Sequence, residues 1–264
     1  MRDAIQARLT EIEESHCVRI LYACEAGSRA WGFPSADSDY DVRFIFVRPT
    51  DRLLVQGLPW AERHNGLKDQ IDDRTVKELD IVGWSLAKTL GLLVASNPPL
   101  YEWLGSPIVY RASHEIERLS ALAVGFYTPR KASYHYAHMA ENNWKQYLHG
   151  ETVWTKKYFY VLRPLLAALW LAEGRGEVPT AFDALVTTLI VDMGTKRAIA
   201  DLLARKLTGD ELADGPHITV LDAYIENNLA RILVPPPPTV VVPPPPLDEL
   251  AQFYLDVVRG RMRR

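Results

Sequence analysis

The chain of 264 residues has 30 basic and 33 acidic side chains, a formal net charge of −3, and 48% hydrophobic residues. This composition is typical of a globular protein with a sizeable core, and it argues against disorder and against binding of nucleic acid through bulk positive charge. Two cysteines cannot form a disulfide framework, and no Cys/His spacing is typical of zinc. The N-terminal segment lacks a signal core and no long uncharged apolar run follows, which predicts a cytoplasmic protein without a membrane span.

Hydrophobic periodicity predicts strands in the first part of the chain and helices in the rest. A helix is expected over residues 2–15, followed by strands over 17–24, 40–49 and 75–82. The stretch 51–73 has turn residues and little periodicity, so it is interpreted as a loop. The pattern becomes helical from Gly83, is broken by the residues 96–104, and predicts several helices between residues 113 and 233.

These elements divide into four segments: a first domain over residues 1–110, a helical domain over 111–234, a proline-rich strap over 235–246, and a C-terminal helix with a basic tail over 247–264. The strap is expected to adopt polyproline II and to span roughly 37 Å as a stiff spacer, with a ligand for an SH3-type domain as the alternative. The apolar stripe of the last helix, which predicts that it packs back on the body, consists of Leu250, Phe253, Tyr254 and Val257.

The segment GSRAWGFPSADSDYD, residues 27–41, lies between two predicted strands and carries the chemistry. Asp39 and Asp41 are two residues apart at the start of a predicted strand, so their side chains point to the same face and their carboxylates lie about 7 Å apart. Two carboxylates held that close repel each other unless a cation lies between them, and hard oxygen ligands suit Mg²⁺ or Mn²⁺. Asp80 supplies a third carboxylate if Leu79 and Ile81 point into the core, although Glu78 is an alternative.

The Gly-Ser turn of the same segment is a candidate phosphate-binding element. Gly27 and Ser28 would let backbone N–H groups approach the β- and γ-phosphates of a nucleotide. Gly32 supplies conformational freedom, Ser38 is placed to brace the loop, and Arg29 is a further candidate for contact with phosphate. Each half of the motif taken alone is also compatible with an ordinary surface turn.

The segment 27–41 resembles the GS-x3-G-x5-SDxD signature of the DNA polymerase β-like nucleotidyltransferase superfamily. The wider pattern over residues 17–175, including GWSLAKTLGLLVASNPPLYEWLGSPIVY and KKYFYVLRPLLAALWL, is similar to the YcgL/RlaP group, which is associated with RNA repair. The resemblance implies an α+β fold, with a small mixed sheet and helices in a catalytic domain followed by a helical domain. It also implies two divalent metal ions, Mg²⁺ or Mn²⁺, and an NTP as substrate, with Asp39, Asp41 and Asp80 as the metal ligands.

In the enzymes that the chain resembles, residues of the helical domain close over the triphosphate. The candidates here, which a charged helix face over an apolar stripe would explain equally well, are Lys156, Lys157, Tyr158, Tyr160 and Arg163. A polar and aromatic cluster at helical spacing could line a nucleotide or acceptor pocket or form a hydrogen-bonded interior. Its members are Tyr134, His135, His138, Asn142 and Asn143.

The resemblance favours an enzyme that moves a nucleoside monophosphate from an NTP to a hydroxyl, with an RNA 3′ end as acceptor and pyrophosphate as the leaving group. One alternative is transfer of AMP or another NMP to a protein or a small molecule. Another is a catalytically silent nucleotide-binding or interaction module that uses the proline-rich strap for docking. Three converging acids favour the enzyme, while the base, the acceptor and the oligomeric state stay open.

Overall fold

The structure is a computed structural model that describes residues 1–50, 68–208, 214–233 and 246–260. A five-stranded mixed sheet forms the N-terminal part, with the strand order β3-β4-β2-β1-β5. The strands β2 and β4 run parallel, and the other neighbouring pairs are antiparallel. The strands are β1 (Arg19–Glu25), β2 (Tyr40–Val47), β3 (Gln70–Asp73), β4 (Leu79–Ser85) and β5 (Val109–Ala112).

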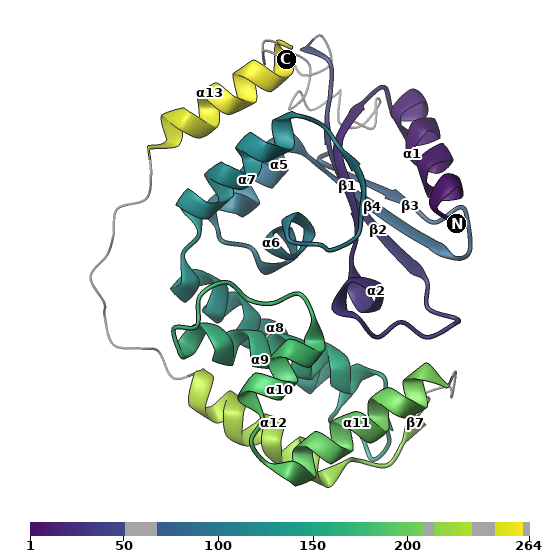
Figure 1. The fold of residues 1–264 in the computed structure, drawn as a ribbon, viewed down its shortest axis with the longest axis vertical. Coiled ribbons are helices and arrows are strands. Elements are labelled where there is room, and N and C mark those ends of the chain that lie inside the picture. The colour runs from purple at the N-terminus through teal and green to yellow at the C-terminus, as the bar shows by residue number, and fades with distance from the viewer. Residues whose placement is uncertain (51–67, 209–213, 234–245, 261–264) are drawn as a thin grey trace.

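Helices cover both faces of this sheet (Figure 1). Because side chains alternate along a strand, Val42, Phe44 and Phe46 of β2 pack on one face, and Ile45 and Val47 pack on the other. The covering helices are α1 (Arg2–His16) on the first face, and α5 (Leu86–Val94), α6 (Pro98–Leu104), α7 (Glu115–Phe126) and α13 (Leu247–Val258) on the second.

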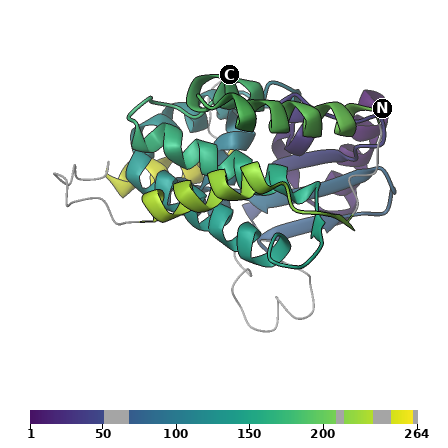
Figure 2. The ribbon, with the colours of Figure 1, turned by 90° about the horizontal axis from the view of Figure 1, so that it is seen from below.

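The rest of the chain is mostly helical, as predicted, and its helices run side by side when seen from below (Figure 2). Nearly every side chain of the central helix α9 is buried, because α8, α10 and α12 pack around it. A short two-stranded antiparallel sheet of β6 with β7 accompanies these helices. The elements are α8 (Pro129–Tyr147), β6 (Val153–Trp154), α9 (Lys157–Ala172), α10 (Phe182–Leu189), α11 (Met193–Leu207), β7 (Asp214–Gly215) and α12 (Thr219–Ile232).

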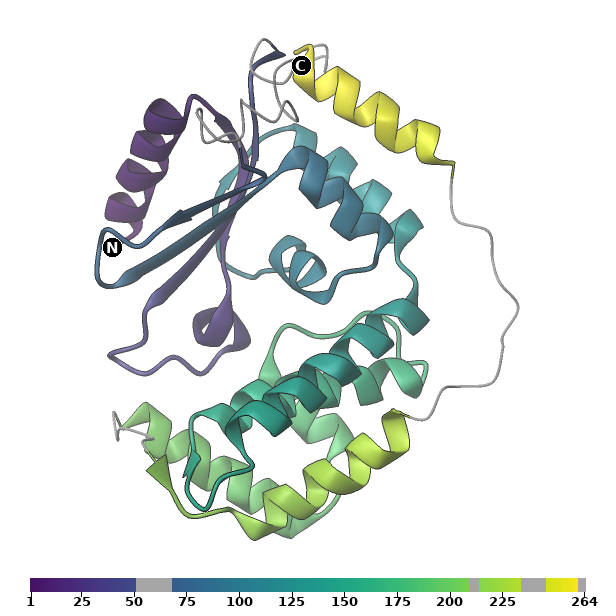
Figure 3. The same ribbon diagram turned by 180° about the vertical axis from the view of Figure 1, so that it is seen from behind.

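The C-terminal helix α13 returns to the sheet domain, far from the end of α12 (Figure 3). Leu250, Phe253 and Val257 of α13 are buried in the same core cluster as Leu86 and Leu119. The prediction that the last helix packs back on the body is therefore confirmed. The predicted polyproline strap and the end of the basic tail fall almost entirely outside the described residues.

The structure corrects the sequence interpretation at five places. The start of the predicted 27–41 loop is a short helix, α2 (Gly27–Trp31), and β3 lies in the stretch interpreted as a loop. Strand β4 continues past Gly83, where the sequence predicted the start of helical structure. A glycine is required there because the ring of Phe44 occupies the space that a side chain would need. The predicted break contains α6, whose first turn is capped by the side chain of Asn97, and β5 was not predicted.

Candidate active site

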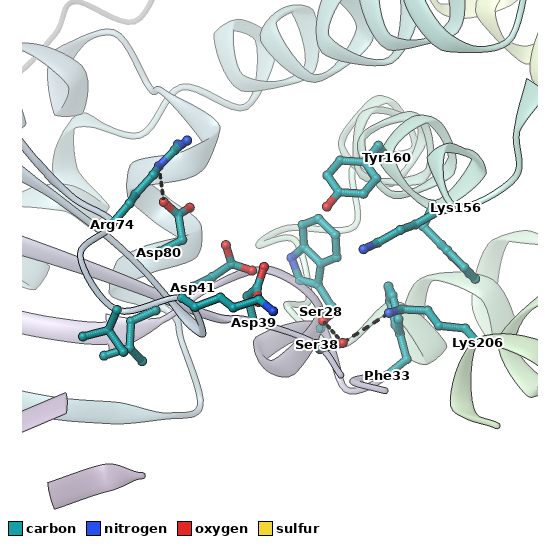
Figure 4. Close-up of a pocket in the computed structure, with 15 residues that line it drawn as sticks. Ser28, Phe33, Ser38, Asp39, Asp41, Arg74, Asp80, Lys156, Tyr160 and Lys206 are labelled. Atoms are coloured by element: carbon teal, nitrogen blue, oxygen red, sulfur yellow. Dashed lines mark hydrogen bonds and ion pairs between the residues drawn. The ribbon is translucent and has the colours of Figure 1, made fainter. Parts of the chain in front are cut away.

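A cleft of about 350 Å³ lies where the sheet domain faces the helical domain. Figure 4 shows acidic side chains on the sheet side and lysine side chains opposite them. The sheet-domain residues that line it are Ser28, Trp31, Phe33, Ser38, Asp39, Asp41, Arg74, Val76, Lys77, Leu79 and Asp80, and the helical domain contributes Lys156, Phe159, Tyr160 and Lys206. The cleft therefore brings together most of the side chains that the sequence motif singled out.

The parallel pairing of β2 with β4 sets Asp41 directly beside Asp80. Leu79 and Ile81 are buried in the core, as predicted, so the side chain of Asp80 is directed to the opposite face. The guanidinium of Arg43 joins the two acids, with 2.9 Å from its Nη2 to Asp41 Oδ1 and 2.9 Å to Asp80 Oδ2. Glu78 does not line the cleft, so Asp80 is the third carboxylate there.

The acids differ in their surroundings. Arg74 Nε lies 3.0 Å from Asp80 Oδ1, so both oxygens of Asp80 face an arginine. Asp39 faces the cleft, and no described residue donates a hydrogen bond to its carboxylate. Burial raises the pKa of Asp41, and the neighbouring charges of Asp80 and Asp39 add to this rise while Arg43 opposes it. A cation bound beside Asp39 and Asp41 would therefore reduce the repulsion among these carboxylates.

A fully buried glutamate orients Asp41 from behind. Glu25, at the end of β1, accepts a hydrogen bond from the backbone N–H of Asp41 at 2.8 Å through Oε1. Its other oxygen accepts a hydrogen bond from the hydroxyl of Tyr110. Burial raises the pKa of Glu25, and the bond from Tyr110 opposes that rise. The sequence analysis missed Glu25, although an acid at the end of an apolar strand is a recognisable signal.

Gly27 lies against Asp41 so closely that no side chain fits. Its φ of +57° is in the left-handed region, and a Cβ would lie 2.0 Å from Asp41 Oδ2. Ser28 lines the cleft, and its hydroxyl lies 3.4 Å from that of Ser38. Ser38 also accepts a hydrogen bond from the backbone N–H of Ser35 at 3.0 Å, so it braces the loop as expected.

Arg29 supports the loop from the side. Its Nη2 donates to the carbonyl of Ser38 at 2.6 Å and its Nε to the carbonyl of Asp39 at 3.2 Å. The guanidinium also lies 3.7 Å from the ring centroid of Tyr40. Arg29 is not among the residues that line the cleft. Its hydrogen-bonding groups hold the backbone that carries Asp39.

Two lysines and a tyrosine of the helical domain face the acids. Lys156 and Tyr160 come from the start of α9, and Lys206 comes from the end of α11. The ammonium of Lys206 lies 3.4 Å from the hydroxyl of Ser38 (Figure 4). It also lies 3.2 Å from the hydroxyl of Ser35. Burial lowers the pKa of Lys206, and the charge of Lys156 lowers it further.

Lys206 was not predicted from the sequence. It lies at helical spacing from Ile199 and Leu202 and is buried like them. A lysine on the apolar stripe of a helix is the signal that could have found it, because such a charge needs a compensating partner.

Other predicted candidates lie outside the cleft. Arg163 is only 1% exposed, donates to the carbonyl of Pro179 at 3.2 Å, and lies 3.4 Å from Glu102. Lys157 is enclosed by aromatic rings, and Tyr158 donates a hydrogen bond to Asp222. Arg163 therefore does not face the acids as Lys156 does, because its deeply buried guanidinium points to Glu102 of α6.

The polar and aromatic cluster of α8 also lies outside the cleft. The exposed ring of Tyr134 packs against His138, which pairs with Glu141. Asn143 donates a hydrogen bond to the carbonyl of Tyr160 at 2.8 Å and so supports the start of α9. The structure places the cluster along α8 and does not gather it into a pocket with the acids.

The donors of the cleft have the right chemistry for a divalent cation. Asp39 and Asp41 present carboxylate oxygens, the ligands that Mg²⁺ and Mn²⁺ prefer. Within the described ranges, no three His, Cys, Asp or Glu side chains already lie close enough together to form a metal site. Asp80 is paired with Arg43 and Arg74 in this arrangement.

The site has two acids at the start of one strand of a mixed sheet, a third acid on the parallel neighbouring strand, and a Gly-Ser turn beside them. This arrangement is typical of nucleotidyltransferases of the DNA polymerase β type. The family comparison agrees with this class. Residues 1–256 match the family described as "RlaP: RNA repair pathway DNA polymerase beta family", and the chain belongs to it.

Two further comparisons describe relatives of the chain. It is 43% identical over 259 residues to the uncharacterized protein YcgL of Bacillus subtilis (strain 168), covering 98% of this chain and 96% of that protein. A solved nucleotidyltransferase-like protein from Exiguobacterium sibiricum 255-15 is similar at a TM-score of 0.30 and 11% identity, covering 98% of this chain and 80% of that one. A search of the described helices finds none that is both long and apolar enough to cross a membrane.

Proposed function

We propose that the protein is a divalent-metal-dependent nucleotidyltransferase that moves an NMP from an NTP to the 3′ hydroxyl of an RNA. The acceptor oxygen forms a bond to the α-phosphorus, and the bond from that phosphorus to the oxygen bridging the α- and β-phosphates breaks. Pyrophosphate leaves, and the proton of the acceptor hydroxyl passes to water. The observation that carries the proposal is the register of Asp41 with Asp80, which sets two acids beside Asp39 in a cleft facing Lys156 and Lys206. The chain belongs to a family whose description names an RNA repair pathway, which supports RNA as the acceptor.

Different residues of the cleft would act on the NTP and on the RNA acceptor. Asp39 and Asp41 would hold the metal ion on the nucleotide side, and Asp80 would serve the acceptor side. A bound divalent ion neutralises charge on the phosphates and lowers the pKa of a bound hydroxyl. Lys156 and Lys206 would place positive charge beside the leaving pyrophosphate, since both line the wall opposite the acids.

Glu25 keeps the backbone of Asp41 in place and is a positioning residue, because it is buried behind the strand. The Gly27-Ser28 turn has its serine in the cleft and its glycine packed on Asp41, so a phosphate bound at the turn would lie beside the acids. These contacts connect the sequence motif with a single reaction centre.

The test uses the purified protein with Mg²⁺ or Mn²⁺ and each α-³²P-labelled NTP, offering short RNAs and total cell protein as acceptors. The variant Asp39→Asn/Asp41→Asn removes both carboxylates, and Asp37→Asn is the matched control, because Asp37 is exposed two residues away and does not line the cleft. Label on the RNA 3′ end that the double variant abolishes and the control retains is the expected result. Label on protein supports the alternative acceptor, and NTP binding without any label supports a silent nucleotide-binding module.

A further inference from the structure

Three aromatic rings enclose the ammonium of Lys157 next to the cleft. The Nζ of Lys157 lies 4.3 Å from the ring centroid of Tyr147, 4.6 Å from that of Trp154 and 4.4 Å from that of Tyr160. Burial among these rings lowers the pKa of Lys157, and the charge of Lys156 lowers it further. The ammonium of the lysine thus contacts all three rings, which come from three separate segments of the chain. We call Tyr147, Trp154 and Tyr160 the aromatic platform.

The platform keeps a large part of its surface in contact with solvent. Trp154 is 44% exposed and Tyr160 is 39% exposed, whereas most large aromatic side chains of this protein are buried or partly buried. Tyr160 lines the cleft, while Tyr147 and Trp154 do not. The platform thus begins at the cleft and continues outward beyond it.

Its parts are held in fixed positions. Trp154 lies in β6, which pairs with β7, and the preceding Val153 is buried in the core of the helical domain. The backbone of Tyr160 accepts a hydrogen bond from Asn143. His217 Nε2 bonds to the carbonyl of Gly150, three residues before β6, at 2.7 Å. Exposed rings supported in this way lose little conformational entropy when a flat ligand stacks on them.

We propose that the aromatic platform binds bases of a single-stranded nucleic acid whose 3′ end enters the cleft; this inference rests on the proposed function. Stacking on exposed rings holds single strands without regard to sequence, and lysines beside the rings meet the phosphates. A mononucleotide in the cleft would reach Tyr160 but would not extend to Trp154, so the outer part of the platform fits the nucleotides that precede an acceptor end. This arrangement also suits a chain with a net charge of −3, because a few aromatic contacts replace a broad basic surface.

The test measures binding without any transfer. A fluorescein-labelled RNA of eight nucleotides, blocked by a 3′ phosphate, is titrated with protein in the absence of NTP, and anisotropy gives the Kd at fixed salt. Trp154→Ala removes the most exposed ring of the platform, and Trp154→Phe retains a ring there. The matched control is Tyr134→Ala, since Tyr134 is 66% exposed on the same helix as Tyr147 but about 20 Å away along its axis.

Trp154→Ala is expected to raise the Kd by about tenfold or more, as loss of one base–ring stack requires, with Trp154→Phe near wild type and Tyr134→Ala within about twofold. Equal losses in Trp154→Ala and Tyr134→Ala, no loss in either, or no binding of RNA by the wild type would overturn the proposal. Melting curves of the variants exclude misfolding as the cause of any loss.

The two proposals fail in different ways. Weaker RNA binding in Trp154→Ala supports the platform even if the wild-type protein labels no acceptor, and that result would reject only the transfer reaction. Transfer to RNA with unchanged binding by Trp154→Ala would reject the platform and keep the proposed function. Label found on protein in the transfer assay, together with no RNA binding, would reject both the platform and the RNA acceptor.

Discussion

The substitution Gly27→Ala tests whether the Gly-Ser turn and the acids form one unit. A Cβ at this position would lie 2.0 Å from Asp41 Oδ2 and 2.8 Å from Asp41 Cγ, so either the carboxylate or the turn must move by an ångström or more. The left-handed φ of +57° adds a backbone cost of about 1–2 kcal/mol for any residue with a side chain. A displacement of about 1 Å at a reacting centre lowers a rate by about a hundredfold.

The control for this substitution is Gly32→Ala at the other end of α2. Gly32 has a φ of +92°, so alanine meets a similar backbone cost, but no atom lies within 4 Å of the new Cβ. We expect both variants to lower the Tm, by about 2–4 °C for each kcal/mol of lost stability. Gly27→Ala alone should also lose about a hundredfold or more in nucleotide transfer and should bind Mn²⁺ more weakly in a titration followed by electron paramagnetic resonance.

The outcome that contradicts this reasoning is a Gly27→Ala variant that transfers nucleotide and binds Mn²⁺ as well as the wild-type protein does. Asp41 would then tolerate the displacement, and the close approach of Gly27 would have no role in the reaction. Equal losses in both variants would instead assign the effect to backbone strain in α2, and the carboxylate would not be the cause.

Two further predictions concern the helical domain. Lys206→Met should weaken binding of Mg²⁺–NTP by about 10- to 100-fold in calorimetry, because the buried charge beside Ser35 and Ser38 is lost. The control Arg197→Gln, on the exposed side of α11, should change the affinity less than about twofold. Wild-type affinity in Lys206→Met would exclude contact of Lys206 with phosphate. His217 can donate a hydrogen bond to both Gly150 and Asp222 only when its imidazole is protonated. The carbonyl of Gly150 is the larger cause that raises the pKa of His217, and Asp222 raises it further. Its stabilisation should be complete below about pH 6.5 and should disappear as the pH rises through the folded-state pKa, so the Tm difference between wild type and His217→Gln should shrink between pH 6 and 9; a constant difference would contradict this.

The sequence predicted the sheet side of the site well, because local pattern determines it. Two acids separated by one residue on a strand must share a face, and the buried neighbours of Asp80 orient that carboxylate without any knowledge of the fold. The pairing of Asp41 with Asp80 then follows once β2 and β4 lie side by side. The short strands β3 and β5 were missed because each has only four residues and little periodicity.

The helical side could not be predicted in the same way, because it depends on how distant helices pack. Lys206 lies about fifty residues from Lys156, and only the docking of α11 against the loop of Ser35 and Ser38 brings the two lysines to one wall. Arg29 lies within the motif itself, yet the direction of its side chain is set by the loop carbonyls to which it donates hydrogen bonds. Spacing along one helix identified Lys156 and Tyr160 correctly as neighbours of the cleft and left the partner helix unknown.

Arg163 shows how a residue at the right spacing can serve the site indirectly. Its guanidinium lies 3.4 Å from Glu102 of α6 and 5.7 Å from the ring centroid of Trp31 in α2. Glu102 also accepts hydrogen bonds from Tyr136 at 2.8 Å and from the indole of Trp31 at 3.3 Å. One acid of the sheet domain thus holds α8 and α9 against the helix that follows Gly27. Because Tyr160 lies one turn before Arg163 on α9, this buried network fixes the distance between the acids and the wall that faces them.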